Sequence, residues 1–238
     1  MVEKKPNFIV VGAMKAATTS LYTYLKQHPE IFMTKVKEPM FFNNFKQENK
    51  YKILGKKSKK PTTLKEYLAM FDDVKNEKAI GEASPAYIYN PQAPQLIKEH
   101  LSNVKIIAIL RQPTDRAYSN YLHTKRADRE DAATFQEAIE LENKRIKDNW
   151  SPLYHYIEKG YYSVQLKRYF DLFSEKNIKI YLFEDVVKNT KETLKDIFKF
   201  LEVDENVEID TSKKANVSGN PSGLMGWVLK KMRYYNLM

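Results

Sequence analysis

The apolar residues of this chain form short, β-branched runs that alternate with segments of helical periodicity. The strongest runs lie at residues 8–11, 104–110 and 178–183, and a shorter one lies at residues 79–82. Runs of this length, closed by turn residues, are typical of buried strands. The segments between them predict helices over residues 21–28, 67–71, 93–101, 113–129, 135–146, 161–173 and 192–201.

Strands that alternate with helices form parallel sheets covered by helices on both faces. The sequence therefore predicts an α/β fold, a P-loop-like three-layer arrangement around a central parallel sheet. No internal repeat and no linker-like stretch divides the chain, so we expect residues 1–238 to form a single domain.

Basic residues exceed acidic ones, 40 against 30, which gives a formal charge of +10. Such a balance favours anionic ligands such as a nucleotide or an acidic saccharide, but it also fits lysines that are simply solvated. The dispersed tyrosines do not form an RNA-binding signature, so we expect no nucleic-acid partner. A Lys-rich run at residues 56–60 is predicted to be a loop.

The chain has no Cys, which excludes disulfides, thiolate catalysis and Cys-ligated zinc. Its histidines and carboxylates show no spacing typical of a metal site, so we expect no metal. The first apolar run is too short for a signal peptide, and no run approaches the roughly 18 residues of a transmembrane helix. We therefore expect a cytoplasmic protein without a transmembrane segment; the sequence does not indicate its oligomeric state.

Residues 12–20 read Gly-Ala-Met-Lys-Ala-Ala-Thr-Thr-Ser and connect the first predicted strand to the first predicted helix. Backbone N–H groups at a helix N-terminus attract anions, and small residues let phosphate oxygens approach them. The candidate phosphate ligands are Lys15, Ala16, Ala17, Thr18, Thr19 and Ser20. The alternative is an ordinary strand-to-helix turn capped by Thr18. The order of residues excludes a nucleoside-triphosphate P-loop, in which Lys follows the second Gly.

Three more blocks follow this loop. They read Lys-Glu-Pro-Met-Phe-Phe at 37–42, Gly-Glu-Ala-Ser-Pro-Ala-Tyr at 81–87 and Ile-Leu-Arg-Gln-Pro-Thr-Asp-Arg-Ala-Tyr-Ser at 109–119. In this order the four blocks resemble sulfotransferases that use 3′-phosphoadenosine 5′-phosphosulfate (PAPS), above all the domains acting on heparan sulfate and their bacterial relatives. The resemblance spans about residues 7–220. The chain ends sooner than many members, so we keep open the reading that it is truncated at the C-terminus.

The resemblance implies PAPS as donor and adenosine 3′,5′-bisphosphate (PAP) as product. It implies that residues 15–20 hold the 5′-phosphosulfate and that Arg111 and Ser119 hold the 3′-phosphate. Arg111 follows a predicted parallel strand, where such sheets bind ligands, and its planar guanidinium suits phosphate; the alternative is a surface charge. The resemblance also places Tyr161 beside the nucleotide, although Tyr161 could belong to the core. A loop over the donor would contain Lys213, Lys214, Asn216 and Ser218, or would simply be solvated.

Sulfuryl transfer needs in-line geometry and stabilisation of charge on the leaving phosphate. Lys15 is the candidate for that charge. Glu38 matches the family's proposed general base, and residues 40–42 would desolvate it; the alternative is an exposed loop Glu. His123 is the rival base, because Arg116, Ser119 and His123 share a helix face, and relatives acting on the glucosamine amino group carry a His here. A structural His is the alternative.

The resemblance implies that the acceptor is a hydroxyl or an amine on a small molecule or saccharide. Heparan sulfate enzymes carry a Lys where this chain has Ala83, which puts heparan sulfate in doubt as the acceptor. Two other classes of function stay open. A nucleotide kinase or NTPase is disfavoured by the loop order and by the lack of an evident magnesium carboxylate. A non-catalytic module that binds nucleotide or polyanion would use the basic surface alone.

Overall fold

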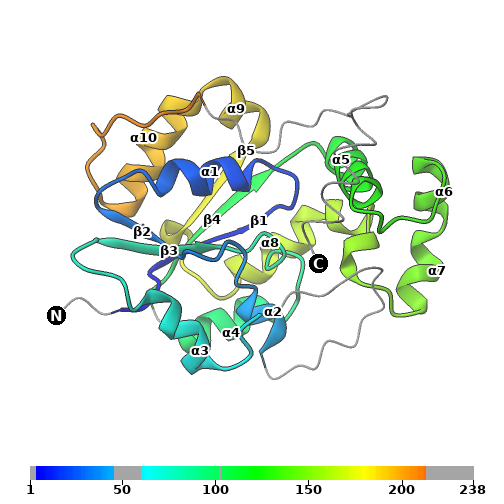
Figure 1. Cartoon of the computed structure of the whole chain (residues 1–238), viewed down its shortest axis with the longest axis horizontal. Helices are drawn as coiled ribbons and strands as arrows, with labels where there is room; N and C mark the ends of the chain where they lie inside the picture. The colour runs from blue at the N-terminus through cyan, green and yellow to red at the C-terminus, as the bar shows by residue number, and fades with distance from the viewer. Residues whose placement is uncertain (1–3, 46–59, 102, 213–238) are drawn as a thin grey trace, which may run out of the picture.

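Five parallel strands form the central sheet of the computed structural model, which describes residues 4–45, 60–101 and 103–212 (Figure 1). The strand order is β2-β3-β1-β4-β5. The strands are β1 (Phe8–Gly12), β2 (Ile31–Met33), β3 (Ala79–Ala83), β4 (Lys105–Leu110) and β5 (Ile178–Leu182). The predicted fold class is confirmed.

Helices cover both faces of this sheet. They are α1 (Thr18–Leu25), α2 (Phe41–Asn44), α3 (Leu64–Leu68), α4 (Ala93–His100), α5 (Pro113–Arg126), α6 (Phe135–Glu140), α7 (Glu142–Lys147), α8 (Tyr162–Phe170), α9 (Phe183–Lys188) and α10 (Thr190–Leu201). Figure 1 shows α1, α9 and α10 above the sheet, α2, α3 and α4 below it, and α5, α6 and α7 to one side. Single turns of 3₁₀-helix occur at Ala69–Phe71, Pro152–Tyr154, Glu158–Gly160 and Glu175–Asn177.

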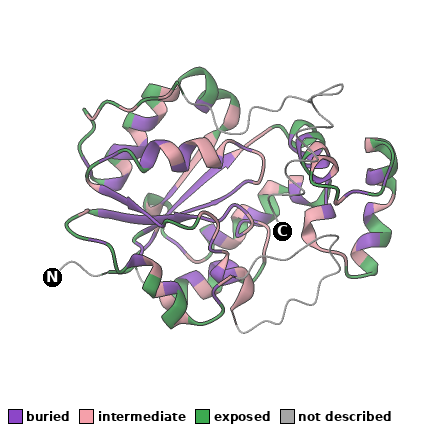
Figure 2. Cartoon of the chain, viewed as in Figure 1, coloured by how far each residue is buried: buried purple, intermediate pink, exposed green. Residues whose placement is uncertain are grey.

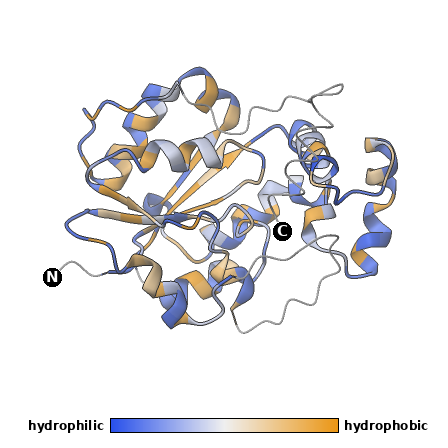
Figure 3. Ribbon diagram, in the orientation of Figure 1, coloured by the Kyte–Doolittle hydropathy of each residue, from blue (hydrophilic) through white to orange (hydrophobic). Residues whose placement is uncertain are grey.

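The centre of the sheet is buried, whereas the edge strand β5 is only partly buried. All five residues of β1 and of β3 are buried, and the strands form the purple and orange centre of Figures 2 and 3. Gly81 pairs with Phe8 across the sheet, and a Cβ at Gly81 would come within 2.2 Å of the Phe8 ring. Only glycine fits there, so the closest packing at the sheet centre depends on this position.

The carboxyl ends of β1, β3 and β4 meet at one edge of the sheet. Phe8 of β1 is paired with Gly81 on one side and with Lys105 on the other. The chain leaves β1 toward β2 and leaves β3 toward β4 on the opposite side. Open α/β sheets bind ligands at such a reversal of strand order. Three of the four sequence blocks follow these strands directly.

Most of the predicted elements are confirmed, with four differences. The three-residue strand β2 and the four-residue helix α2 were not predicted, because neither is long enough to show a period. Helix α9 follows β5 directly and was also missed. The helix predicted over residues 135–146 divides at Leu141 into α6 and α7. None of the described helices is long and apolar enough to cross a membrane.

Candidate active site

The loop between β1 and α1 is shaped by two residues with left-handed backbone. Lys15 has φ 67° and Ala17 has φ 59°, a conformation that costs about 1 kcal/mol for a residue with a Cβ. Ala17 is the N-cap of α1, and it makes no side-chain cap hydrogen bond. The alternative of a turn capped by Thr18 is therefore wrong. The uncapped N–H groups at this end of α1 suit an anion.

The candidate ligands of this loop lie together, as a continuous turn requires. Thr18 is 5% exposed, while Thr19 and Ser20 are half-buried in the first turn of α1. Ala16 is fully buried, so its small side chain packs within the core and does not face a ligand. The half-buried Lys15 is the residue of the loop that adds a full positive charge.

Arg111 leaves the end of β4 and is fixed against the same loop. Its Nη1 atom donates to the backbone oxygen of Lys15 at 3.2 Å, and its guanidinium carbon lies 4.6 Å from the centre of the Phe183 ring. Its buried Nε atom has no hydrogen-bond partner among the described residues. Arg111 is thus held beside the loop, half-buried, with a donor left over for an anion.

The cations around the loop lower the pKa values of Lys15 and His123. Burial lowers the pKa of Lys15, and the charges of Arg126 and Arg111 lower it further, while Glu38 opposes them. Burial, Lys15 and Arg126 lower the pKa of His123 to about 4, although part of its surface is exposed. The imidazole of His123 is therefore neutral at pH 7, and the site has a positive potential.

Glu38 lies in the segment after β2, which also has unusual backbone. Glu38 has φ 60° and Met40 has φ 56°. The Glu38 side chain is 38% exposed, and its Oε1 atom accepts from Lys37 Nζ at 2.9 Å. Lys60 Nζ donates to the Glu38 backbone oxygen at 2.5 Å. Glu38 is near enough to Lys15 and His123 for its charge to raise both pKa values.

The aromatic residues after Glu38 do not desolvate its carboxylate, so that expectation is wrong. Phe41 and Phe42 are buried, with exposed fractions of 0% and 1%. Phe41 stacks on Tyr67 with ring centres 4.5 Å apart, and Phe42 meets the edge of Tyr87 at 5.5 Å. They anchor the segment in the core while Glu38 stays accessible.

Arg116, Ser119 and His123 follow one another along helix α5 from the interior of the protein to its surface. Arg116 is fully buried and donates through Nη2 to the backbone oxygen of Tyr156. Ser119 is 5% exposed, and His123 is exposed. Tyr161 is 54% exposed, so the alternative that it belongs to the core is wrong. Lys213, Lys214, Asn216 and Ser218 lie outside the described residues.

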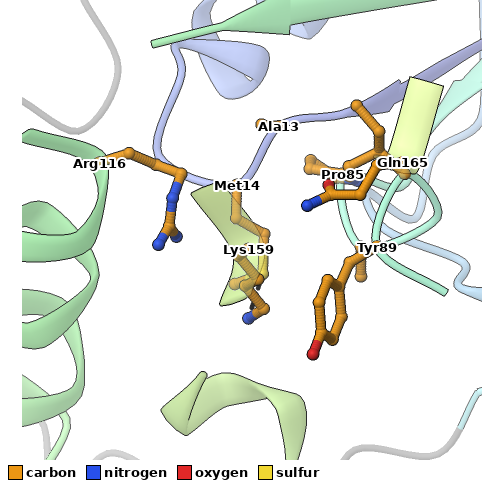
Figure 4. A pocket seen from close by; sticks show the side chains of 9 residues that line it. Ala13, Met14, Pro85, Tyr89, Arg116, Lys159 and Gln165 are labelled. Carbon is orange, nitrogen blue, oxygen red and sulfur yellow. Dashed lines mark hydrogen bonds between the residues drawn. The ribbon is translucent and has the colours of Figure 1, made fainter. Parts of the chain in front are cut away.

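Sequence reasoning missed Lys159, a buried residue behind the loop between β1 and α1. It lines a small cavity with Met14, Tyr89, Arg116 and Gln165 (Figure 4). Lys159 Nζ is 3.3 Å from the Met14 sulfur and 5.8 Å from the centre of the Tyr89 ring. Burial and the Arg116 charge lower the pKa of Lys159 to about 7. In the sequence, Lys159 stands out only because it precedes Gly160 and Tyr161, and in a Lys-rich chain this position is a weak indication of a functional residue.

Glu82 was also missed, although it lies inside one of the four blocks. It is fully buried on β3, and three hydroxyl groups donate to its carboxylate. Burial raises the pKa of Glu82 to about 7. A sequence does not show which of its carboxylates a fold will enclose.

Known proteins are similar to this chain in both sequence and fold. The sulfotransferase domain family matches residues 5–233, so the chain belongs to the sulfotransferase family. Among solved structures, a sulfotransferase from Alicyclobacillus acidocaldarius is 35% identical, with a TM-score of 0.83 over 89% of this chain and 87% of that one. A mouse sulfotransferase complexed with PAP has a TM-score of 0.54 at 18% identity, covering 85% of this chain and 60% of that one; it supports the fold alone.

Curated relatives are longer than this chain. The membrane-associated sulfotransferase kil1 of Dictyostelium discoideum is 39% identical over 116 residues, which is 49% of this chain and 22% of the relative. The bifunctional heparan sulfate N-deacetylase/N-sulfotransferase 4 of Mus musculus is 28% identical over 208 residues, or 83% of this chain and 22% of the relative. The chain thus spans about a fifth of the length of each of these relatives. Together with the family match, these similarities confirm the resemblance to sulfotransferases.

Proposed function

We propose that this protein transfers a sulfuryl group from PAPS to a hydroxyl or amine acceptor. The observation that carries the proposal is the juxtaposition of Arg111 with the loop of residues 13–17. Arg111 Nη1 donates to the Lys15 backbone oxygen at 3.2 Å, while its buried Nε has no partner among the residues described. One solved structure of the same fold, the mouse sulfotransferase, is complexed with PAP.

The donor fits the residues present. Uncapped N–H groups of α1 and the Lys15 ammonium would hold the 5′-phosphosulfate, and Arg111 with Ser119 would hold the 3′-phosphate. PAPS supplies the sulfuryl group when bound. A guanidinium stacked on Phe183 offers its remaining N–H groups in a fixed plane, which suits phosphate oxygens.

Glu38 acts as the general base in this proposal. Its carboxylate accepts the proton that the acceptor oxygen or nitrogen loses as that atom bonds to sulfur. The bond between sulfur and the leaving phosphate oxygen breaks, and Lys15 offsets the negative charge that collects on that oxygen. His123, neutral at pH 7, lies near Lys15 and would orient the acceptor by a hydrogen bond.

The acceptor class follows less directly. Relatives of this chain include bifunctional heparan sulfate N-deacetylase/N-sulfotransferases. The Lys that the resemblance to heparan sulfate enzymes leads us to expect is replaced here by Ala83, which is fully buried. We therefore propose an uncharged or weakly charged acceptor bearing a hydroxyl or an amine, rather than a highly sulfated glycan.

The test is turnover of ³⁵S-labelled PAPS with 4-nitrophenol, an aliphatic alcohol and an oligosaccharide with free glucosamine amino groups. Glu38→Gln keeps the shape of the side chain but removes proton acceptance, so the single-turnover rate should fall by about 10²–10⁴-fold. Its PAP affinity, measured by calorimetry, should change little. Glu99→Gln, on the exposed end of α4, is the matched control and should react normally.

His123→Ala separates the two candidate bases. It should weaken acceptor binding while it leaves the rate at saturation within a few fold. Normal turnover in Glu38→Gln together with collapse in His123→Ala would assign the base to His123. A protein that binds PAP but transfers no label to any acceptor would favour the non-catalytic module.

A further inference from the structure

The carboxylate of Glu82 is enclosed by hydroxyl groups from three residues. Ser84 Oγ donates to Oε2 at 2.6 Å, Tyr87 OH donates to Oε1 at 2.8 Å, and Tyr67 OH donates to Oε1 at 3.2 Å. Glu82, Ser84, Tyr67 and Tyr87 are all fully buried. No cation is hydrogen-bonded to the Glu82 carboxylate within the described part of the chain.

The carboxylate sets the direction of these hydroxyl groups. An ionised carboxylate only accepts hydrogen bonds, so each hydroxyl proton points at Glu82 and the hydroxyl lone pairs point elsewhere. Ser84 Oγ uses a lone pair to accept from the Met40 backbone N–H at 3.0 Å. Tyr87 OH accepts from the Phe42 backbone N–H at 3.4 Å. Two backbone groups after Glu38 are thus tied to β3.

These ties hold a segment that would otherwise relax. Glu38 and Met40 both have left-handed backbone, which persists only where the surroundings enforce it. The Met40 N–H that donates to Ser84 Oγ therefore belongs to one of the two residues with left-handed backbone. Phe41 stacking on Tyr67 and Phe42 packing on Tyr87 hold the same segment through the rings whose hydroxyls reach Glu82.

We propose that Glu82 is a positioning residue for sulfuryl transfer, which, through the hydroxyls of Ser84 and Tyr87, fixes the backbone at Met40 and Phe42 and thereby the Glu38 carboxylate. The proposal rests on the proposed function, since it gives Glu82 a role only if Glu38 takes the acceptor proton. Burial raises the pKa of Glu82 to about 7 although the hydrogen bonds from Ser84, Tyr87 and Tyr67 lower it, so the carboxylate is ionised and accepts from all three hydroxyls above about pH 7.

Tyr87→Phe is the mildest test, because it removes one hydroxyl and keeps the ring against Phe42. We expect kcat with ³⁵S-labelled PAPS to fall by about 10-fold to 100-fold, the usual effect of a small misplacement of a reacting group. PAP affinity should stay within about twofold, because neither Arg111 nor the α1 N-terminus touches this network. Glu82→Gln should lower kcat at least as much, since an amide donates as well as accepts and cannot receive all three hydroxyls.

Tyr181→Phe is the matched control. Tyr181 OH donates to Asp196 Oδ2 at 2.7 Å, so the variant also removes a hydroxyl–carboxylate hydrogen bond, but between β5 and α10. It should lower the melting temperature like Tyr87→Phe while kcat stays unchanged. A purely structural role for Glu82 would make the two variants behave alike in both measurements, and that result would overturn the proposal.

The double variant Glu38→Gln/Tyr87→Phe separates the proposal from the function on which it rests. If Glu82 acts through Glu38, Tyr87→Phe should lower the single-turnover rate no further once Glu38 is replaced. Multiplicative losses would show that the network acts elsewhere and would refute the positioning role. Normal turnover in Glu38→Gln alone would instead refute the assignment of the base.

Discussion

Replacing Lys159 by Met should stabilise the protein, and more at low pH than at high pH. Lys159 is 5% exposed, and its Nζ atom donates to the Met14 sulfur at 3.3 Å. Met has a similar length and a thioether that suits this surrounding. Glu142, whose charge raises the pKa of Lys159, accepts hydrogen bonds from three backbone N–H groups and pairs with no cation in the described residues.

The magnitude follows from the lowered pKa. A fall from the ordinary 10.5 to about 7 means that keeping the ammonium charged in the folded protein costs on the order of 5 kcal/mol. The unfolded chain binds this proton up to about pH 10.5, and the folded protein releases it near pH 7. The unfolded state therefore holds more protons between these values, and wild-type stability rises with pH across that window.

The advantage of Lys159→Met is thus complete below pH 7 and shrinks above it. Between pH 6 and pH 9 it should fall by on the order of 2–3 kcal/mol. For a chain of this size that corresponds to roughly 5–10 °C in melting temperature.

Calorimetric melting of both proteins at pH 6 and pH 9 tests this. Other groups titrate in the same range, but they cancel in the difference between wild type and variant. Lys167→Met is the control, since the exposed Lys167 pairs with Asp171 at 2.6 Å and such a pair contributes about 0.5 kcal/mol. An equal gain at both pH values, or a loss at pH 6, would contradict the reasoning.

Two further predictions concern the donor site. Arg111→Ala should weaken PAP binding by about 30-fold to several thousand-fold, the range for losing one partner of a buried charge pair, and should leave AMP binding nearly unchanged. Calorimetry with both nucleotides decides this, and equal losses would show that Arg111 does not contact the 3′-phosphate. Turnover should be the same with and without EDTA, because Lys15, Arg111 and Arg126 supply positive potential at the loop; activity lost in EDTA and restored by magnesium would point to a kinase.

The sequence was sufficient for the elements whose pattern is local. The strands β1 and β4 are nearly continuous apolar runs, and a run buried on both faces is visible without knowledge of its neighbours. The partly buried β5 still shows β-branched and aromatic residues in a short run. The three-residue β2 was not predicted because it is too short to show a period, and its pairing with β3 is a contact distant in sequence. Leu141, where α6 and α7 divide, packs against a cluster that includes Ala117 and Tyr121 of α5, a contact that the local sequence does not show.

The candidate site divides in the same way. The loop around Lys15, the strand-end Arg111 and Glu38 were predictable because each lies in a recognisable block next to a strand. Lys159 and Glu82 were not, because their importance depends on burial, and burial is decided by segments distant in sequence. The Met14 sulfur that Lys159 meets is 145 residues away along the chain. Neither residue type nor spacing signals such a contact.

The cations near the loop explain why the site favours an anion even before any ligand is considered. Burial, together with Arg126 and Arg111, lowers the pKa of Lys15, so holding these charges together costs the folded protein free energy. The same holds behind the loop, where Arg116 lowers the pKa of Lys159. A bound polyanion reverses the sign of these interactions, and the repulsion among the cations becomes part of the affinity.

Glu38 is the carboxylate that raises the pKa of Lys15, and it adds a proton acceptor to this field while its charge opposes the anion. A site meant only to bind a polyanion gains nothing from a carboxylate held there by left-handed backbone. A site that must also accept a proton gains a base from this carboxylate.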